Sequence, residues 1–283
     1  MFKKDKTIAR CRKNKYFLII IGFILLFGIF LFIFSVRRNL LHVYFFNVGQ
    51  GDAILIRTPS NKNILIDGGP DNLILHRLGE VLPFYIRRLD YIIISHFHDD
   101  HIIGLVEVLK RYQVAKIIFV SSEISSPAVM ALQEEIKKLN LPLINIKTTG
   151  TLRLDGYCRL FFINPTSLNI KDNENNSLTA KLDCADHEFL FAGDNEAAAE
   201  SALIKSSFDL RADIFKASHH GSKTSNTEAF LKAVRPQKMI ISVGKDNRFG
   251  HPNQEVLDRA EIMGIEVQRT DINDTIDILA EIR

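Results

Sequence analysis

The chain has 283 residues, of which 46% are hydrophobic and 24% are charged, with 15 glycines and 8 prolines. This composition excludes a disordered, collagen-like or low-complexity protein and is sufficient for a sizeable folded core. The three cysteines are too few for a disulfide scaffold and form no CxxC pair. Any metal must therefore be bound by histidine and carboxylate side chains.

Positive charge is concentrated at the N-terminus. Residues 1–15 contain seven lysines or arginines and one aspartate, which gives a charge of +6. Since the whole chain carries +3, the remainder carries −3. The folded part therefore lacks the broadly basic surface that grips duplex nucleic acid, although it can still contain a local basic groove.

An uncharged and strongly apolar stretch runs from residue 16 to residue 36. As a helix, at about 1.5 Å per residue, it would span the roughly 30 Å hydrocarbon core of a bilayer. A cleaved signal peptide is the alternative, but its apolar part is shorter and ends at small residues, whereas SVRRNLL follows here. We therefore expect one transmembrane signal anchor. The basic tail before it predicts a cytoplasmic N-terminus, a single-pass cell-membrane protein and an extracytoplasmic domain over residues 39–283.

Beyond the anchor, short runs rich in β-branched and aromatic residues are mixed with longer amphipathic segments, without an internal repeat or a long linker. The predicted strands lie at residues 41–48, 53–57, 63–67, 91–95, 116–120, 159–164, 177–183, 188–194, 212–218, 238–244 and 275–281. Helical spacing is found at residues 102–111, 127–139, 195–205, 226–234 and 253–262. Ser225 and Glu228 form a capping box for the fourth of these helices. Strands come first and then mix with helices, which favours a single-domain α/β sandwich.

The pattern His-x-His-x-Asp-His follows the predicted strand at residues 91–95. His96 and His98 are two residues apart on an extended loop, so both can chelate one divalent cation. Asp100 and His101, where the chain turns into a helix, can bind a second cation. Imidazole and carboxylate ligands favour zinc, with manganese or iron as alternatives. Four ligand-type residues at one strand-to-helix junction indicate a metal site rather than a solvated turn.

Three further motifs place candidate site residues at strand ends or turns. Asp67 and Asp194 each end a predicted strand, and from the residues alone the first could begin a turn and the second could cap the next helix. His219 and His220 follow another strand, where they are either metal ligands or hydrogen-bonded core histidines. His251 lies on a Gly-His-Pro turn.

Two cysteines lie in the predicted strands at residues 157–164 and 177–184. If these strands pair antiparallel, Cys158 and Cys184 could lie opposite each other, and an extracytoplasmic domain permits a disulfide. Two separately buried thiols are the other interpretation.

Six motifs, in their order, resemble the metallo-β-lactamase fold superfamily, and within it the hydrolase domain of ComEC-type competence proteins. They are FNVGQGDAILI, ILIDGG, SHFHDDH, FLFAGD, KASHHGS and SVG followed by GHP, and the resemblance covers residues 42–281. It implies a four-layer αββα sandwich preceded by the single membrane helix. It also implies a hydrolase with two divalent metal ions, Zn²⁺ with Mn²⁺ as the alternative.

The resemblance further implies a role for each candidate residue. The metal ligands would be His96, His98, Asp100, His101, Asp194 and His220. Asp194 would bridge the two metals, and Asp67 would orient the histidines from behind. Many members of the superfamily carry a further histidine before the bridging aspartate, but the stretch NENNSLTAKLD contains none. The first metal would then have three protein ligands and open positions for water or substrate.

A two-cation site of this kind suits the hydrolysis of phosphodiesters. The catalytic candidates are Asp100, which would orient the attacking water, and His219 and His251, which would stabilise or protonate the leaving oxygen. The resemblance implies a phosphodiesterase or nuclease linked to competence, acting on single-stranded DNA rather than on duplex, alone or with a separate membrane channel protein. The alternatives are an extracellular phosphoesterase for cell-envelope phosphoesters, a lactam or lactone hydrolase, and a non-catalytic tethered binding module.

Overall fold

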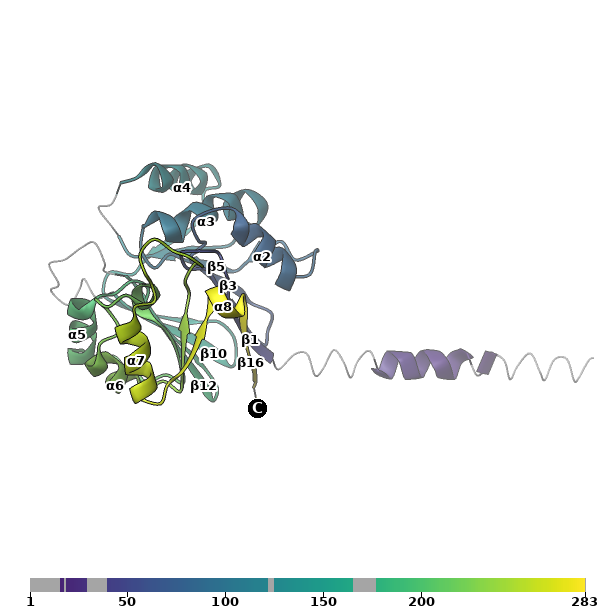
Figure 1. The fold of residues 1–283 in the computed structure, drawn as a ribbon. Coiled ribbons are helices and arrows are strands. Elements are labelled where there is room, and N and C mark those ends of the chain that lie inside the picture. Colours follow the sequence, from purple (N-terminus) through teal and green to yellow (C-terminus); the bar gives the residue numbers. More distant parts are fainter. Residues whose placement is uncertain (1–15, 18, 30–39, 122–124, 165–176, 283) are drawn as a thin grey trace, which may run out of the picture.

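The computed structural model describes residues 16–17, 19–29, 40–121, 125–164 and 177–282 (Figure 1). Residues 16–17 and 19–29 are helical. Within these described ranges, no helix has both the length and the hydropathy that a membrane crossing requires. The predicted span continues to residue 36, and its last seven residues, like the basic tail 1–15, lie outside the described residues.

In the described part of the chain, two seven-stranded sheets form the centre of the domain (Figure 1). The first sheet has the order β16-β1-β2-β3-β5-β7-β8 and the second the order β15-β14-β13-β12-β11-β10-β9. The first comprises β1 Leu40–Phe45, β2 Ile54–Arg57, β3 Asn63–Ile66, β5 Tyr91–Ile93, β7 Ile117–Phe119, β8 Leu143–Asn145 and β16 Ile276–Glu281. The second comprises β9 Thr149–Arg153, β10 Cys158–Ile163, β11 Thr179–Cys184, β12 His187–Phe191, β13 Ile214–Lys216, β14 Lys238–Ile241 and β15 Glu266–Arg269. A short parallel pair is formed by β4 Arg88–Leu89 and β6 Gln113–Val114.

Helices cover the outer face of each sheet (Figure 1). Those on the first sheet are α2 Leu73–Val81, α3 Asp99–Arg111 and α4 Pro127–Lys138. Those on the second are α5 Ala197–Lys205, α6 Glu228–Val234 and α7 Gln254–Ile262. The short helix α8 Thr270–Asn273 joins β15 to β16, and a tight turn, η3 Ser218–Gly221, follows β13.

Buried apolar side chains of the described residues form three clusters, one for each boundary between layers. The central cluster joins the inner faces of the two sheets, with Phe45 and Phe191 in contact across it. A second cluster joins the first sheet to α2–α4. A third joins the second sheet to α5–α7. Because strands alternate their side chains between two faces, each sheet can bury both faces in this way. The domain is therefore a four-layer αββα sandwich, as expected.

Several local features differ from the prediction. The capping box at Ser225 is wrong: α6 begins at Glu228, and its N-cap is Thr227, whose hydroxyl accepts from the backbone N–H of Phe230 at 3.2 Å. The backbone at Asn226 has φ 58°, so a helix cannot start before it. Helix α2 was not predicted, because it has neither a side-chain cap nor charged residues that complement its dipole.

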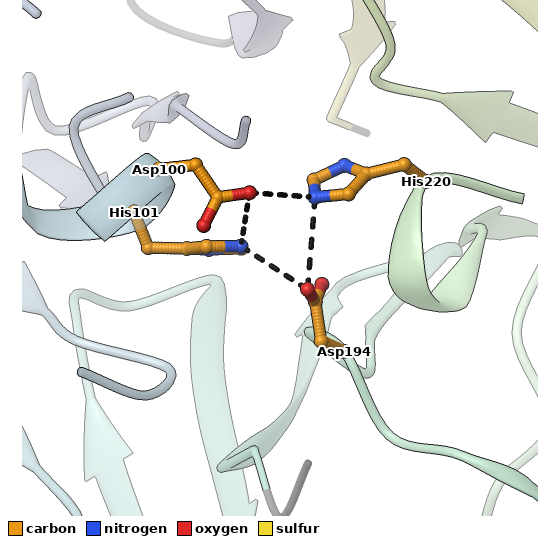
Figure 2. A group of neighbouring side chains, drawn as sticks. All are labelled: Asp100, His101, Asp194 and His220. Atoms are coloured by element: carbon orange, nitrogen blue, oxygen red, sulfur yellow. Dashed lines mark ion pairs between the residues drawn. The ribbon is translucent and has the colours of Figure 1, made fainter. Parts of the chain in front are cut away.

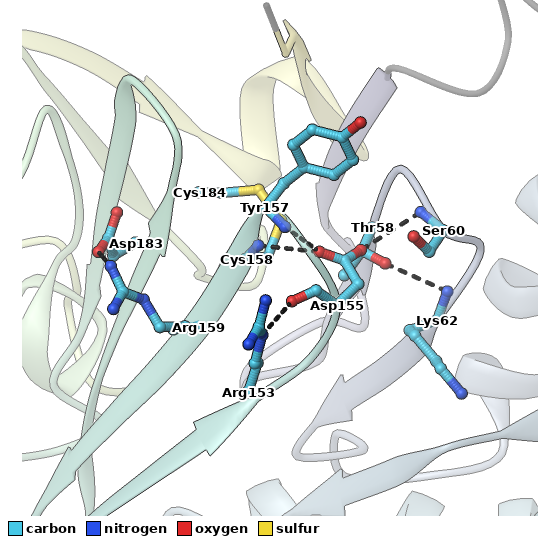
Figure 3. The surroundings of a disulfide bond; sticks show 10 residues. All are labelled: Thr58, Ser60, Lys62, Arg153, Asp155, Tyr157, Cys158, Arg159, Asp183 and Cys184. Carbon is cyan, nitrogen blue, oxygen red and sulfur yellow. Dashed lines mark hydrogen bonds and ion pairs between the residues drawn. A yellow bond between two sulfur atoms is a disulfide. The ribbon is translucent and has the colours of Figure 1, made fainter.

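The two domain cysteines face each other across the β10–β11 pair. Cys158 and Cys184 are register partners, both are buried, and a disulfide joins them (Figure 3). Of the two interpretations of these cysteines, the structure contains the bridge. Asp155, beside the bridge, accepts hydrogen bonds from the backbone N–H groups of Tyr157 and Cys158 at 2.8 Å and of Ser60 at 3.3 Å (Figure 3).

Candidate metal centre

The predicted site residues meet where strands of both sheets end. Strands β3 and β5 are parallel, so the segments that follow them, with Asp67 and His96, leave the same edge of the first sheet. Strands β12 and β13 are also parallel, so Asp194 and the His219–His220 turn leave one edge of the second sheet. The carboxyl ends of neighbouring parallel strands are where α/β sheets place binding groups.

Two groups of metal-ligand side chains share Asp194. Ligand atoms of His96, His98 and Asp194 lie within 4.8 Å of one another, and so do those of Asp100, His101, Asp194 and His220 (Figure 2). The Oδ2 atom of Asp194 lies 3.7 Å from Nε2 of His96, 3.4 Å from Nε2 of His101 and 3.6 Å from Nε2 of His220. The structure thus brings together all six predicted ligands, with Asp194 common to both groups.

The start of α3 places Asp100 and His101. The helix begins at Asp99, three residues earlier than expected, with His98 in an extended conformation as its N-cap. Two aspartates in the first turn complement the positive end of the helix dipole. This helical turn carries Asp100 and His101 over the centre, with Nε2 of His220 3.3 Å from Oδ2 of Asp100 (Figure 2).

Asp67 lies behind His101, with φ 57° in the left-handed region. Its carboxylate accepts hydrogen bonds from the backbone N–H of Ser95 at 2.8 Å and from the Ser95 hydroxyl at 2.7 Å. It also receives the Nδ1–H of His101 at 2.9 Å. This bond leaves Nε2 of His101 facing Asp194, which is how a carboxylate behind a ligand sets its tautomer and ring orientation.

The backbone at Asp194 is tightly constrained. Gly193 has φ +55°, and a Cβ there would meet the side chain of Ser177 at 2.4 Å, so only glycine fits. The backbone N–H of Asp194 donates to the Ser177 hydroxyl at 2.8 Å. Helix capping by Asp194, the alternative from the residues alone, is wrong because the N-cap of α5 is Glu196.

The His219–His220 turn is also strained, with φ 49° and 53°. Asn226 supports it, accepting from the N–H of Ser218 at 2.8 Å and donating to its carbonyl at 2.9 Å. Nδ1 of His220 donates to the carbonyl of Ser242 at 2.9 Å, which leaves Nε2 for the centre. His220 is buried, whereas the His219 side chain is 27% exposed at the rim. The structure therefore groups His220 with the other ligands and leaves His219 open to solvent.

His251 lies at the same rim, with its ring centroid 5.7 Å from that of His219. Burial, followed by the nearby His219 and His220, lowers the pKa of His251 to about 4. The ring is therefore neutral at pH 7.

The centre stabilises positive charge. Burial raises the pKa of Asp194, but His220 and His101 outweigh burial and hold it well below its ordinary value. Burial lowers the pKa of His101, but Asp194 and Asp67 raise it well above its ordinary value. In the same way, Asp194 and Asp52 raise the pKa of His220 to about 9 against the effect of burial. Burial and the neighbouring His101 instead lower the pKa of His96, so it is the carboxylates of the centre that favour a bound cation.

The ligand atoms themselves fit a metal. Among the described residues, Nε2 of His96, His101 and His220 and Oδ1 of Asp194 are buried without a hydrogen-bond partner. Buried polar atoms rarely remain unpaired unless a ligand or ion completes them. Their imidazole and carboxylate chemistry matches zinc or a similar divalent ion.

Asp52 and Lys216 were missed by the sequence analysis. Both are fully buried, and the Lys216 ammonium binds the Asp52 carboxylate directly behind the centre. Oδ1 of Asp52 lies 3.4 Å from Nδ1 of His220. The available signal was their place in motifs that the sequence analysis had already singled out, Asp52 in FNVGQGDAILI and Lys216 in KASHHGS.

Comparison with solved structures supports the fold alone, because the identities are low. YhfI, a metallo-β-lactamase fold protein from Bacillus subtilis, has a TM-score of 0.60 at 13% identity and covers 86% of this chain and 100% of its own. CmlA, a diiron β-hydroxylase from Streptomyces venezuelae, has a TM-score of 0.55 at 13% identity and covers 86% of this chain and 54% of its own. Human tRNase Z, short form, has a TM-score of 0.53 at 13% identity and covers 84% of this chain and 98% of its own. CmlA and tRNase Z differ in activity, so the fold does not decide the reaction.

Sequence comparison finds competence proteins. ComE operon protein 3 of Bacillus subtilis is 28% identical over 263 residues, which is 87% of this chain and 34% of the relative. Competence protein ComA of Neisseria gonorrhoeae is 27% identical over 245 residues, covering 84% of this chain and 32% of the relative. This chain thus spans about a third of these relatives. Since the metallo-β-lactamase superfamily model also matches residues 46–245, the chain belongs to that superfamily of generally metal-dependent hydrolases and is related to competence proteins.

Proposed function

We propose that this chain is a membrane-anchored phosphodiesterase that uses two divalent cations and acts on nucleic acid outside the cytoplasm. The observation that carries the proposal is the pair of ligand groups joined at Asp194. Two-cation sites are a recurrent solution for the hydrolysis of phosphodiesters. The relationship to competence proteins favours DNA as the substrate, and the mildly acidic domain favours single strands over duplex.

The residues of the candidate centre have separate proposed roles in binding the cations and in positioning water. His96, His98 and Asp194 would hold one cation, and Asp100, His101, Asp194 and His220 the other. Bound there, the cations would supply Lewis-acid activation of water and of the phosphoryl oxygens. Asp100 can orient the attacking water, because its side chain is 34% exposed. Burial raises the pKa of Asp100, but the neighbouring His220 and His101 outweigh burial and lower it to about 2, so Asp100 is ionised at pH 7.

The rim histidines face the side from which a substrate can enter. His251 has a neutral ring at pH 7, so we assign it a hydrogen bond to the leaving oxygen rather than proton donation. We assign proton donation to His219, whose Nδ1 lies 3.4 Å from Oε1 of Glu196.

The proposed location is the outer face of the cell membrane, with residues 16–36 as the anchor and the N-terminus in the cytoplasm. The basic tail before the apolar segment supports this orientation. The Cys158–Cys184 disulfide also supports it, because such bonds persist in oxidising compartments. We propose a separate membrane channel protein as the partner, with action of this chain alone as the alternative.

The test compares substrates with the full chain in detergent, loaded with Zn²⁺ or Mn²⁺. We expect turnover of bis-aryl phosphate and of single-stranded DNA, and loss of both turnover and bound metal in Asp194→Ala. The matched control is Asp186→Ala, an exposed aspartate in the β11–β12 turn, which should behave like the parent.

Other outcomes contradict the proposal in distinct ways. Turnover of a chromogenic lactam alone would support a lactam hydrolase. Turnover of a choline-phosphate ester without cleavage of DNA would support the cell-envelope alternative. Metal-free protein that turns over none of these substrates would support a tethered binding module.

A further inference from the structure

An exposed aromatic pair lies in the loop between α2 and β4. We call residues 82–87 the α2–β4 tip. Phe84 and Tyr85 are 86% and 73% exposed, and their rings pack edge to face with centroids 5.4 Å apart. Single exposed apolar residues are common, but two adjacent large aromatic rings at a loop tip indicate an apolar or interfacial partner.

The α2–β4 tip lies at the sheet edge where β1 begins. His42, Arg57 and Asn63 form one row across β1, β2 and β3. Arg57 donates to the carbonyl of Val81, the last residue of α2, at 3.3 Å. Asn63 donates to the carbonyl of Arg88 at 3.3 Å. Both ends of the tip are thus hydrogen-bonded to this row. His42 in the row lies two residues after Leu40, which is the first described residue after the proposed anchor.

The metal centre lies at the opposite edge of the same sheet. It follows the carboxyl end of β3, where Asp67 stands four residues after Asn63. At about 3.3 Å per residue the two ends of this strand segment are roughly 13 Å apart. A surface that contacts the α2–β4 tip therefore leaves the centre facing away from it.

Exposed basic side chains lie on the α2–β4 tip and on the chain segments next to it. Arg87, Arg88, Arg111 and Lys116 are all exposed. Backbone hydrogen bonds hold their segments side by side, from Gln113 to Arg87 at 2.8 Å and from Ala115 to Leu89 at 3.0 Å. Two acidic side chains of this region are already paired, Glu80 with Arg77 at 3.1 Å and Asp90 with Lys62 at 3.0 Å, and Asp90 also lies 3.8 Å from Nε of Arg88. The edge therefore presents positive charge around an aromatic tip.

We propose that the α2–β4 tip docks on an anionic phospholipid bilayer, the one to which residues 16–36 attach the chain. Aromatic rings prefer the level of the lipid headgroups, and arginine and lysine side chains are attracted to anionic lipids. The tip and the anchor together would hold the domain in one orientation, with the metal centre facing the solution. This inference rests on the proposed membrane anchor and not on the proposed hydrolysis.

The test uses tryptophan as a reporter, because the chain contains none. The full chain with Phe84→Trp is reconstituted into phosphatidylcholine–phosphatidylglycerol vesicles that contain brominated acyl chains. We expect a blue-shifted emission and strong quenching by the brominated lipid. The matched control is Phe249→Trp, which lies beside His251 at the opposite edge and is 52% exposed. Its quenching should be several times weaker.

Equal quenching of the two variants, or no quenching of F84W, would overturn the proposal. Arg87→Glu with Arg88→Glu in the F84W background should abolish most of the quenching, and unchanged quenching would contradict the charge argument. Metal content and DNA hydrolysis are measured on the same vesicles. If the tryptophan of F84W is quenched in a preparation that does not hydrolyse DNA, the result supports docking and contradicts the proposed hydrolysis. A chain that does not sediment with vesicles contradicts both the anchor and docking.

Discussion

The buried pair Lys216–Asp52 provides the sharpest test of how the centre is supported. Both residues are at most 2% exposed. They connect the two sheets although they are 164 residues apart in the sequence. Removing one partner of a buried ion pair costs about 3–5 kcal/mol, because the other charge remains buried without compensation. His220, 3.4 Å from Asp52, supplies part of that compensation. We therefore expect Lys216→Met to lower the free energy of unfolding by about 3 kcal/mol, roughly a hundredfold in the equilibrium constant.

The effect should depend on pH. Lys216 and His220 hold the pKa of Asp52 below its unfolded value of 3.8, against burial. The pair therefore contributes stability above about pH 3.8, which is lost as the pH falls through the lower folded pKa. Without Lys216, burial is less opposed, so the pKa of Asp52 moves up toward its unfolded value and the charged carboxylate contributes less stability. The difference between parent and Lys216→Met should be largest near pH 7 and shrink below pH 4.

The assay is urea unfolding of the full chain, followed by circular dichroism at several pH values. In the double variant Asp52→Asn with Lys216→Met, the loss should be smaller than in Lys216→Met by about 1–2 kcal/mol, since no carboxylate is left unpaired. The control is Lys110→Met, which breaks an exposed pair with Glu107 and should cause no measurable change. A loss below about 1 kcal/mol that is independent of pH would refute the reasoning.

Asp67→Asn should weaken metal binding about 10–100-fold, measured by chelator competition, because the carboxylate orients a ligand histidine; unchanged affinity would contradict that role. Gly193→Ala should lower the melting temperature sharply, since its φ is +55° and the new Cβ would meet a serine side chain at 2.4 Å, whereas Gly79→Ala, with open space around it, should not. Replacing both Cys158 and Cys184 by alanine should reduce the free energy of unfolding by about 3–4 kcal/mol, given their separation of 26 residues. Equal urea midpoints for this variant and the parent would show that the bridge adds no stability.

Local sequence patterns predicted most of the sandwich. Each of the eleven predicted strands has a counterpart, because apolar runs of β-branched residues reflect burial on a pleated sheet. The failures were also local. The helix at Leu73–Val81 lacks end signals, and of two neighbouring residues that can cap a helix, Thr227 is used rather than Ser225.

Local sequence patterns locate the strand ends that carry ligand-type residues, and so identify His96, His98, Asp100 and His101 as one group. The packing of the two sheets is needed to show that Asp194 belongs to both ligand groups and does not cap α5, and that His220 is grouped with the ligands while His219 is not. The tertiary structure also decided that the two domain cysteines are bridged and that Asp52 lies against Lys216. The residues next to an aspartate or cysteine in the sequence do not reveal which distant group its side chain contacts. Its partner depends on how two sheets, formed by distant parts of the chain, pack face to face.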